Sequence, residues 1–194
     1  MSNAPKILVF AGSARAGSFN KRLAAAAAGV AGAAGASATL TDLRDHEMPL
    51  YDGDLERDAG LPPGARSFRA LLEAHDGMLI ASPEYNSSIS PLLKNTIDWC
   101  TRPDGDKPSI AFGGQIAALV AASPGRLGGL RGLVHVRAIL QNIGVMVVPK
   151  QLALSHADKA FDEQGNIADS GQRAALEQVV RSLVETVKRM TAGS

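Results

Sequence analysis

The residues best suited to chemistry follow a short apolar run near the N-terminus. They are two hydroxyls, a guanidinium and an amide in a glycine-containing loop: Ser13, Ser18, Arg15 and Asn20. The apolar run at residues 7–11 is too short for a helix and is typical of a buried parallel strand. A strand, a polar loop and a helix in this order direct backbone N–H groups and the positive end of a helix dipole at one place. The loop is therefore predicted to bind an anion such as a phosphate.

A simpler explanation of this loop is also open. Ser18 could serve only as the N-cap of the following helix, and Arg15 could be a solvated surface side chain. The loop lacks the Gly-x-Gly-x-x-Gly pattern of dinucleotide sites and the Gly-Lys-Ser/Thr of P-loop NTPases. Those absences disfavour a dinucleotide site and an NTPase, and phosphate binding remains the favoured interpretation.

Two later loops have a similar polar character. Residues 83–88 read Pro-Glu-Tyr-Asn-Ser-Ser, and an aromatic ring with an amide at the end of a strand suits a planar heteroaromatic ligand. Residues 123–129 contain three glycines, which let a backbone approach a ligand closely. Taken alone, residues 83–88 are better explained as an ordinary turn. Residues 123–129 are explained equally well as a flexible connection.

Alternating strand and helix patterns surround these loops. Five strands are predicted, at residues 7–11, 37–43, 77–82, 115–122 and 143–148. Five helices are predicted, at residues 18–34, 65–74, 91–100, 127–141 and from 170 onward. The alternation indicates an α/β fold with an open, doubly wound parallel sheet. A strand order of 2-1-3-4-5 would bring the exit loops of strands one, three and four into one crevice.

Some segments depart from this simple alternation. Residues 44–64 contain several Pro and Gly and are predicted to form a long loop, and residues 102–114 are predicted to be irregular. The fifth strand is expected to end at Pro149. The helix at 127–141 carries more apolar residues than a single stripe facing a sheet requires.

Composition limits the class of protein. The chain has 194 residues, of which 45% are hydrophobic and 20% charged, as expected for one packed domain over residues 1–194. A net charge of +1 without a basic cluster gives little reason to expect nucleic acid or anionic lipid as a partner. Cys100 is the single cysteine, which excludes an internal disulfide, and no apolar stretch is long enough to insert in a membrane. A cytoplasmic protein is expected.

The remaining reactive side chains define no catalytic centre. The four histidines have no ligand spacing, and Asp52-Gly53-Asp54 has Pro63 where a calcium loop needs a Glu, so no metal site is predicted. Trp99 and Cys100 are interpreted as packing residues. No pair of carboxylates is placed for acid–base work, and the catalytic residue stays unknown.

Together the motifs resemble the NADPH-dependent FMN reductase family, a flavodoxin-like group that includes bacterial quinone, chromate and azo reductases. The matching residues are Gly-Ser-x-Arg-x-x-Ser-x-Asn-x-x-Leu at 12–23, Pro-Glu-Tyr-Asn at 83–86, Leu-Lys-Asn-x-x-Asp-Trp at 93–99, and Ala-Ser-Pro-Gly at 122–125 followed by Gly128-Gly129. They cover nearly the whole chain in order. Ser87 stands where many members have His, and Ser90-Pro91 where many have Pro-Gly, and both differences fall near the expected flavin edge.

The resemblance implies a flavodoxin-like fold that binds FMN. It implies that the FMN phosphate is held by Ser13, Arg15, Ser18 and Asn20, and that Pro83, Glu84, Tyr85 and Asn86 line the isoalloxazine. Ser123 and Gly125 would flank the other side of the ring system, and Phe19 and Ser87 belong to the same cofactor-binding set. Members are usually dimeric or tetrameric, with flavin sites near subunit contacts, so a homodimer or homotetramer is expected. The apolar surplus at 127–141 agrees with a subunit contact, although a deeply buried helix would give the same pattern.

The expected activity is that of an FMN-dependent NAD(P)H oxidoreductase. NADPH or NADH would donate a hydride, and a quinone or similar small acceptor (an azo compound, chromate or flavin) would receive it in a ping-pong cycle. Because the flavin carries the chemistry, no acid–base pair is required of the protein. One alternative is a flavodoxin-type electron carrier, which is disfavoured because such carriers tend to be strongly acidic. A second alternative is a nucleotide-binding regulatory domain that binds no flavin.

Overall fold

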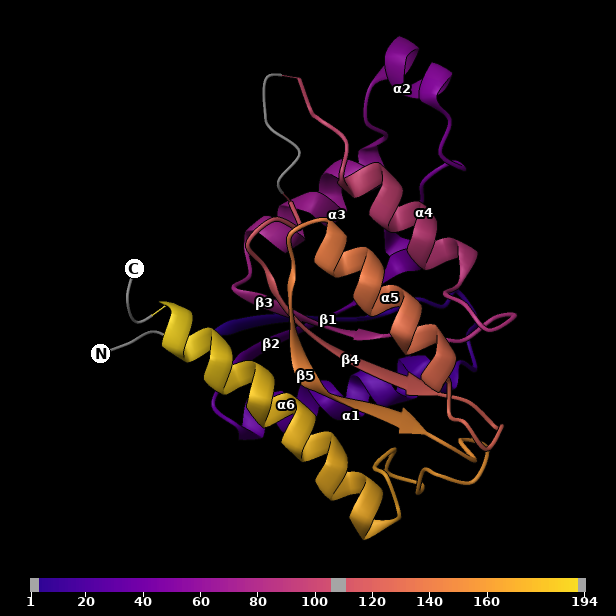
Figure 1. Ribbon diagram of the computed structural model, residues 1–194, viewed down its shortest axis with the longest axis vertical. Helices are drawn as coiled ribbons and strands as arrows, with labels where there is room; N and C mark the ends of the chain where they lie inside the picture. The colour runs from indigo at the N-terminus through magenta and orange to yellow at the C-terminus, as the bar shows by residue number, and fades with distance from the viewer. Residues whose placement is uncertain (1–3, 106–110, 192–194) are drawn as a thin grey trace.

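A five-stranded, all-parallel sheet forms the centre of the computed structural model, which describes residues 4–105 and 111–191 (Figure 1). The strand order is β2-β1-β3-β4-β5, which confirms the predicted order. The strands are β1 (Lys6–Ala11), β2 (Ser37–Asp42), β3 (Gly77–Ala81), β4 (Ile116–Ala122) and β5 (Met146–Leu154). The helices are α1 (Phe19–Ala33), α2 (Gly53–Ala59), α3 (Pro63–Glu73), α4 (Pro91–Cys100), α5 (Leu130–Asn142) and α6 (Ser170–Thr191), with a short 3₁₀ helix, η1, at Leu43–Asp45. Of the segment predicted to be irregular, residues 106–110 lie outside the described residues.

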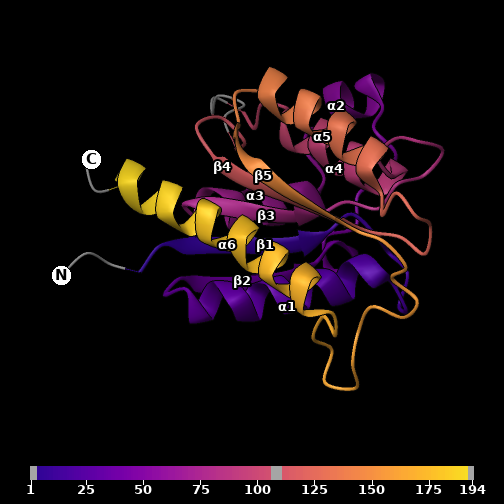
Figure 2. The same cartoon turned by 60° about the horizontal axis from the view of Figure 1, so that its bottom comes forward.

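Helices cover both faces of the sheet (Figure 2). α1 and α6 pack on one face, and α3, α4 and α5 on the other. Ile7 and Val9 of β1 face the first group, whereas Leu8 and Phe10 face the second, because side chains alternate along a strand. With both faces covered, the strand needs an uninterrupted apolar sequence, and this explains the run that begins at residue 7.

Local sequence sets the start and end of α1. Ser18 is its N-cap, and the Ser18 hydroxyl accepts a hydrogen bond from the backbone N–H of Lys21 at 3.4 Å. The chain leaves the helix through Gly35, whose φ of +80° suits glycine. The predicted helix and both of its end signals are therefore confirmed.

At the other end of the chain, α6 is a 22-residue amphipathic helix. Its apolar stripe, which includes Leu176, Val180 and Leu183, is buried against the sheet, as its sequence period predicts. In the part of the chain that the structure describes, no helix combines the length and apolar character required to cross a membrane.

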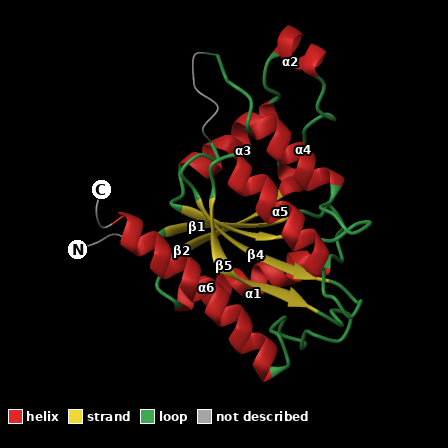
Figure 3. Ribbon diagram, in the orientation of Figure 1, coloured by secondary structure: helices red, strands yellow, loops and turns green. Residues whose placement is uncertain are grey.

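The prediction of a long loop at residues 44–64 is wrong, because α2 lies within it (Figure 3). α2 buries none of its side chains. Instead, Asp52 accepts a hydrogen bond from the backbone N–H of Asp54 at 2.8 Å, and Gly60 ends the helix with a φ of +69°. Because this helix depends on its caps, no apolar period marks it in the sequence.

The predicted end of the fifth strand at Pro149 is also wrong. β5 continues to Leu154 after a register shift, in which Val147 pairs with Ala117 and Gln151 pairs with Leu119. Pro149 falls within this irregularity of an edge strand, where a missing N–H leaves no partner unsatisfied. The extension matters because Leu154 then accepts a hydrogen bond from the backbone N–H of Ser123, at the start of the third polar loop.

The motif Leu-Lys-Asn-x-x-Asp-Trp on α4 fastens the segment that follows β2. The Nε1 of Trp99 and the Nδ2 of Asn95 both donate to the carbonyl of Pro49 at 2.8 Å. The Oδ1 of Asn95 accepts from the backbone N–H of Tyr51 at 2.8 Å. Trp99 is fully buried, which confirms its interpretation as a packing residue.

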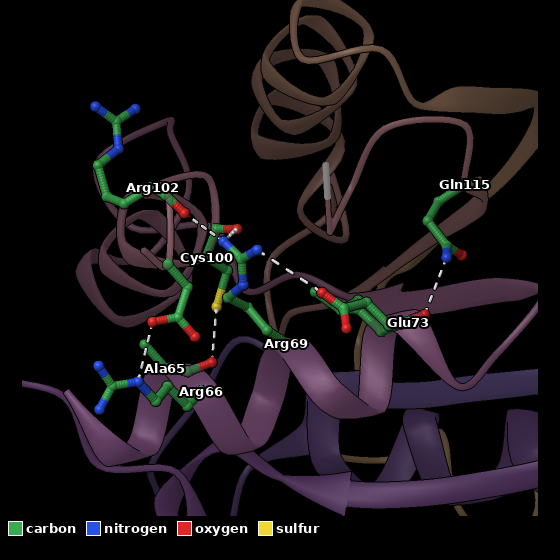
Figure 4. A network of polar contacts seen from close by, with 9 residues as sticks. Ala65, Arg66, Arg69, Glu73, Cys100, Arg102 and Gln115 are labelled. Atoms are coloured by element: carbon green, nitrogen blue, oxygen red, sulfur yellow. Dashed lines mark hydrogen bonds and ion pairs between the residues drawn. The ribbon is translucent and has the colours of Figure 1, made fainter. Parts of the chain in front are cut away.

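A buried arginine fastens the end of α4 to α3 (Figure 4). The guanidinium of Arg69 donates to the carbonyls of Cys100 and Arg102 and lies 3.7 Å from the Glu73 carboxylate. Cys100 is buried beside it, with its Sγ 3.9 Å from the carbonyl of Ala65. Burial raises the pKa of the Cys100 thiol to about 12. The positive charge of Arg69 acts in the opposite direction but is the smaller effect. The thiol therefore stays protonated at neutral pH and acts as a packing group.

Candidate functional site

The loops that follow β1, β3 and β4 surround one cavity of about 80 Å³. The three loops meet because parallel strands all end at the same edge of the sheet, toward which the arrowheads point in Figure 1. The lining residues are Ser13, Arg15, Ser18, Phe19, Asn20, Pro83, Glu84, Tyr85, Ala122, Ser123 and Pro124. The crevice expected from the sequence is therefore present. Asn86, Ser87 and Gly125 do not line this cavity and lie further along the same loops.

Two larger cavities elsewhere lie away from the point where the three polar loops meet. One of about 360 Å³ lies between α1 and α6, over Val30 and Val184. Another of about 310 Å³ lies beside β2, and its Lys21 is already paired with Asp42 at 2.5 Å. The chemistry of the lining, and not the volume, therefore selects the cavity between the three loops.

The first turn of α1 supplies donors for an anion. Within the described residues, the backbone N–H groups of Phe19 and Asn20 have no acceptor, as is usual at a helix N-terminus, and no acidic side chain occupies that turn. The hydroxyls of Ser13 and Ser18 are buried, and each accepts a hydrogen bond from a backbone N–H at 3.4 Å. Each hydroxyl keeps its own proton for donation, so both fit an anion.

The guanidinium of Arg15 adds a positive charge at the rim of the cavity. Arg15 is exposed, and among the described residues its side chain makes no ion pair and no hydrogen bond. An arginine in this state can donate two parallel hydrogen bonds to one phosphate. The role expected from the sequence, phosphate binding by Arg15, stays a prediction.

Asn20 has a different set of partners from the phosphate expected for it. Its buried side-chain amide donates to the carbonyl of Ala122 and accepts from the N–H of the same residue, both at 2.9 Å. These bonds tie the start of α1 to the end of β4 and so fix the first loop against the third. The side chain of Asn20 therefore shapes the wall of the cavity, whereas its backbone N–H has no acceptor among the described residues and is available to an anion.

The second loop is a tight hairpin. The backbones of Tyr85 and Ser88 exchange two hydrogen bonds of 3.0 Å, and the two residues between them, Asn86 and Ser87, have φ values of +49° and +65°. Two central residues with positive φ characterise a type I′ turn. Within the described residues, the N–H groups of Asn86 and Ser87 have no acceptor, which leaves them available to acceptor atoms at the edge of a ligand ring.

Glu84 is engaged with α5. Its carboxylate accepts from Arg131 at 2.6 and 2.8 Å and from the backbone N–H of Gly132 at 3.0 Å. Burial raises the pKa of Glu84, but these hydrogen bonds and the charge of Arg131 outweigh it, and the net pKa is lowered. Glu84 is therefore a carboxylate at neutral pH and is unsuited to act as a general acid.

The third loop depends on two glycines. Gly128 and Gly129 have φ values of +60° and +93°, and Gly129 is the N-cap of α5. A Cβ on Gly128 would lie 2.6 Å from the backbone of Ala153. Earlier in the loop, the Ser123 hydroxyl accepts from the N–H of Gly125 at 3.2 Å.

Sequence reasoning missed the residues of α5 that contact the hairpin. Arg131 and Gly132 bind Glu84, and the Nδ1 of His135 lies 2.9 Å from the Ser88 hydroxyl. An Arg and a His four residues apart on a predicted helix share a face, but nothing local says which loop they contact. Pairing them with the hairpin required the tertiary structure.

The sheet order and the crevice define the class of the protein as flavodoxin-like. A flavodoxin from the domain Archaea has a TM-score of 0.59 to this chain at 11% identity, with 94% of this chain and 99% of the flavodoxin covered, which shows a shared fold. The profile of the NADPH-dependent FMN reductase family matches residues 5–159. The chain therefore belongs to the NADPH-dependent FMN reductase family.

Individual relatives match almost end to end. An NAD(P)H-dependent FMN reductase of Pseudomonas aeruginosa is 37% identical over 191 residues, which covers 98% of this chain and 99% of the relative. A quinone reductase of Escherichia coli is 30% identical over 192 residues, with the same coverage. The flavoenzyme NAD(P)H:(acceptor) oxidoreductase FerB from Paracoccus denitrificans has a TM-score of 0.82 at 26% identity, and the match covers 96% of this chain and 98% of FerB.

Proposed function

We propose that the protein is an FMN-dependent NAD(P)H oxidoreductase that reduces quinones or similar small acceptors. The observation that carries the proposal is the convergence of three loops on one cavity lined by hydrogen-bond donors in a member of the FMN reductase family. Relatives named as NAD(P)H-dependent FMN reductase and quinone reductase support the donor and the acceptor class. NAD(P)H as donor and a single, buried cysteine favour a cytoplasmic location.

The residues of the cavity and of the hairpin beside it fit FMN. Ser13, Ser18, Arg15 and the first amides of α1 would hold its phosphate, and the free amides of Asn86 and Ser87 would bond the polar edge of its ring. When bound, FMN supplies the chemistry of accepting a hydride from NAD(P)H and passing electrons to the acceptor. The protein's contribution is to hold, orient and shield the reacting groups.

No side chain of the cavity is placed as an acid–base catalyst. Glu84 is a paired carboxylate, and the arginine and serines are suited to binding. The cavity of about 80 Å³ is also smaller than the roughly 300–1,000 Å³ of typical small-molecule pockets. Much of a ligand's ring system would therefore lie outside it, where a donor and an acceptor could each reach the ring.

Anaerobic mixing with NADPH, and separately with NADH, tests the proposal. The expected result is bleaching of the flavin absorbance near neutral pH, followed by its return when a benzoquinone is added. FMN that binds but is not bleached by either nucleotide would favour the electron-carrier alternative. A colourless protein whose melting temperature does not change when FMN is added would contradict the proposal.

Replacing Arg15 with alanine should weaken FMN binding. The loss of a charge-assisted contact of about 1.5–3 kcal/mol corresponds to roughly a ten-fold to hundred-fold increase in Kd. Since Arg15 is exposed and lacks partners among the described residues, the flavin-free protein should keep its melting temperature. Titration of FMN fluorescence measures the Kd, with Arg126→Ala, an exposed arginine of the third loop, as the control. An unchanged Kd for Arg15→Ala would exclude the phosphate assignment.

We also propose that α5 mediates a homo-oligomer. Leu130 and Val134 are 42% and 58% exposed, and they continue a stripe from Leu127 that ends at Ala138. Ala138 in turn borders a groove of about 430 Å³ between α4 and α5. Antiparallel packing of α5 on α5 of a second copy would cover this stripe on both subunits, as a two-fold interface requires.

Two neighbouring substitutions separate this contact from folding. Val134→Glu should leave the chain folded and dissociate the oligomer, measured by light scattering after size exclusion. Leu133→Glu should unfold the protein, because Leu133 lies on the fully buried face of α5 and an unpaired charge there costs several kcal/mol. Leu55→Glu, on an exposed part of α2, is the control and should leave the molar mass unchanged. A Val134→Glu variant with the wild-type mass would refute the α5 contact.

A further inference from the structure

The hairpin of the second loop has a backbone conformation that needs support from its surroundings. Asn86 and Ser87 both lie in the left-handed region, and a serine adopts that conformation only rarely. Such conformations persist when the surrounding structure determines them. Two backbone hydrogen bonds between Tyr85 and Ser88 close the hairpin, but they do not fix its direction relative to the sheet.

α5 supplies the contacts that fix this direction. Arg131 pairs with the carboxylate of Glu84 on one side of the hairpin, and His135 bonds the hydroxyl of Ser88 on the other. Between them, Gly132 lets the hairpin lie directly on the helix: a Cβ at this position would be 3.2 Å from the Ser88 carbonyl oxygen and 3.3 Å from the Glu84 Cβ. The helix thus holds both ends of the hairpin, one turn apart.

The carboxylate of Glu84 is used entirely by this contact. Its Oε1 accepts from Arg131 and its Oε2 from the N–H of Gly132, and only 9% of the side chain is exposed. The first turn of α5 has no acidic residue of its own, so Glu84 also supplies the negative charge that a helix N-terminus favours. Its side chain therefore faces the helix, while its backbone stays in the wall of the cavity.

We propose that Glu84, Arg131 and His135 are positioning residues for the flavin ring. They clamp the hairpin so that the free amides of Asn86 and Ser87 stay aimed at the acceptor atoms of a planar heteroaromatic ligand. The proposal rests on the proposed function for the identity of that ligand. The clamp itself is a property of the protein without ligand, and it can be measured there.

The experiment compares Arg131→Ala and Glu84→Gln with Arg181→Ala, which removes an exposed arginine from α6 on the opposite face of the sheet. In flavin-free protein, amide hydrogen exchange of the peptide covering residues 83–90 should be at least about ten-fold faster in the first two variants and unchanged in the third. Peptides from β1 and α6 should keep their protection. Arg131→Lys, which retains the charge, should restore part of the protection.

FMN titration is the second readout. Arg131→Ala and Glu84→Gln should each raise the Kd of FMN by about ten-fold, and the double variant should be no weaker than the weaker single one, because both remove one interaction. Unchanged exchange at 83–90, or faster exchange spread over all peptides, would overturn the clamp. Additive effects on Kd would overturn it as well. If wild-type protein binds no FMN, the proposed function fails, and the exchange data still decide on the clamp.

Discussion

Asn20→Ala is expected to lower the free energy of unfolding by about 2–4 kcal/mol, because it leaves two buried backbone groups of Ala122 without partners. Equilibrium unfolding of flavin-free protein in urea measures this change. Asn20→Asp should be destabilising too, since a carboxylate can accept from the Ala122 N–H but cannot donate to its carbonyl. Asn142→Ala, at an exposed position of α5, is the control and should change stability by less than about 0.5 kcal/mol.

The same variant should bind FMN at least about ten-fold more weakly, because Asn20 fixes the first loop against the third. This combination separates it from Arg15→Ala, which should affect binding and leave stability alone. Wild-type stability in Asn20→Ala would show that the two hydrogen bonds to Ala122 contribute nothing. Wild-type affinity together with reduced stability would show that the cavity tolerates a movement of the third loop.

The sequence predicted the sheet because its signals are local. The three central strands, β1, β3 and β4, read as short apolar runs. The helices α1 and α6 are marked by an N-cap serine and by an apolar stripe, respectively. α2 was missed because it buries no side chain, and the end of β5 was misplaced because Pro149 is tolerated at an irregularity of an edge strand. α2 depends on polar capping interactions, and the course of β5 depends on its position at the edge of the sheet. Neither leaves an apolar period in the sequence.

The same difference between local and distant interactions applies to the residues of the site. Ser13, Ser18 and Arg15 could be placed around one cavity because a loop and the helix that follows it are contiguous in sequence. The side chains of Asn20 and Glu84 bond to residues 102 and 47 positions away, and no local pattern in the sequence names those partners. A sequence motif records that a residue is needed, but it does not distinguish a side chain that contacts the ligand from one that holds the wall in place.

The glycines of the third loop also hold the wall of the cavity without a side chain to contact a ligand. Gly128→Ala is the variant that should show this structural role most clearly. At a φ of +60°, the new Cβ would lie 2.6 Å from the backbone of Ala153, which cannot rotate away as a side chain could. Strain and overpacking together should cost about 2–4 kcal/mol of stability. The movement of β5 or of the loop needed to relieve the clash would displace Ser123, so FMN affinity should fall as well.

Gly125→Ala is the matched control within the same loop. Its φ lies outside the left-handed region, and a Cβ there would meet only the Ser123 Oγ, at 3.6 Å. We therefore expect a stability change below about 1 kcal/mol for Gly125→Ala, measured by urea unfolding beside Gly128→Ala. Equal stability of the two variants would mean that β5 can shift at little cost. The close approach of Gly128 to Ala153 would then not be what holds the third loop against the sheet.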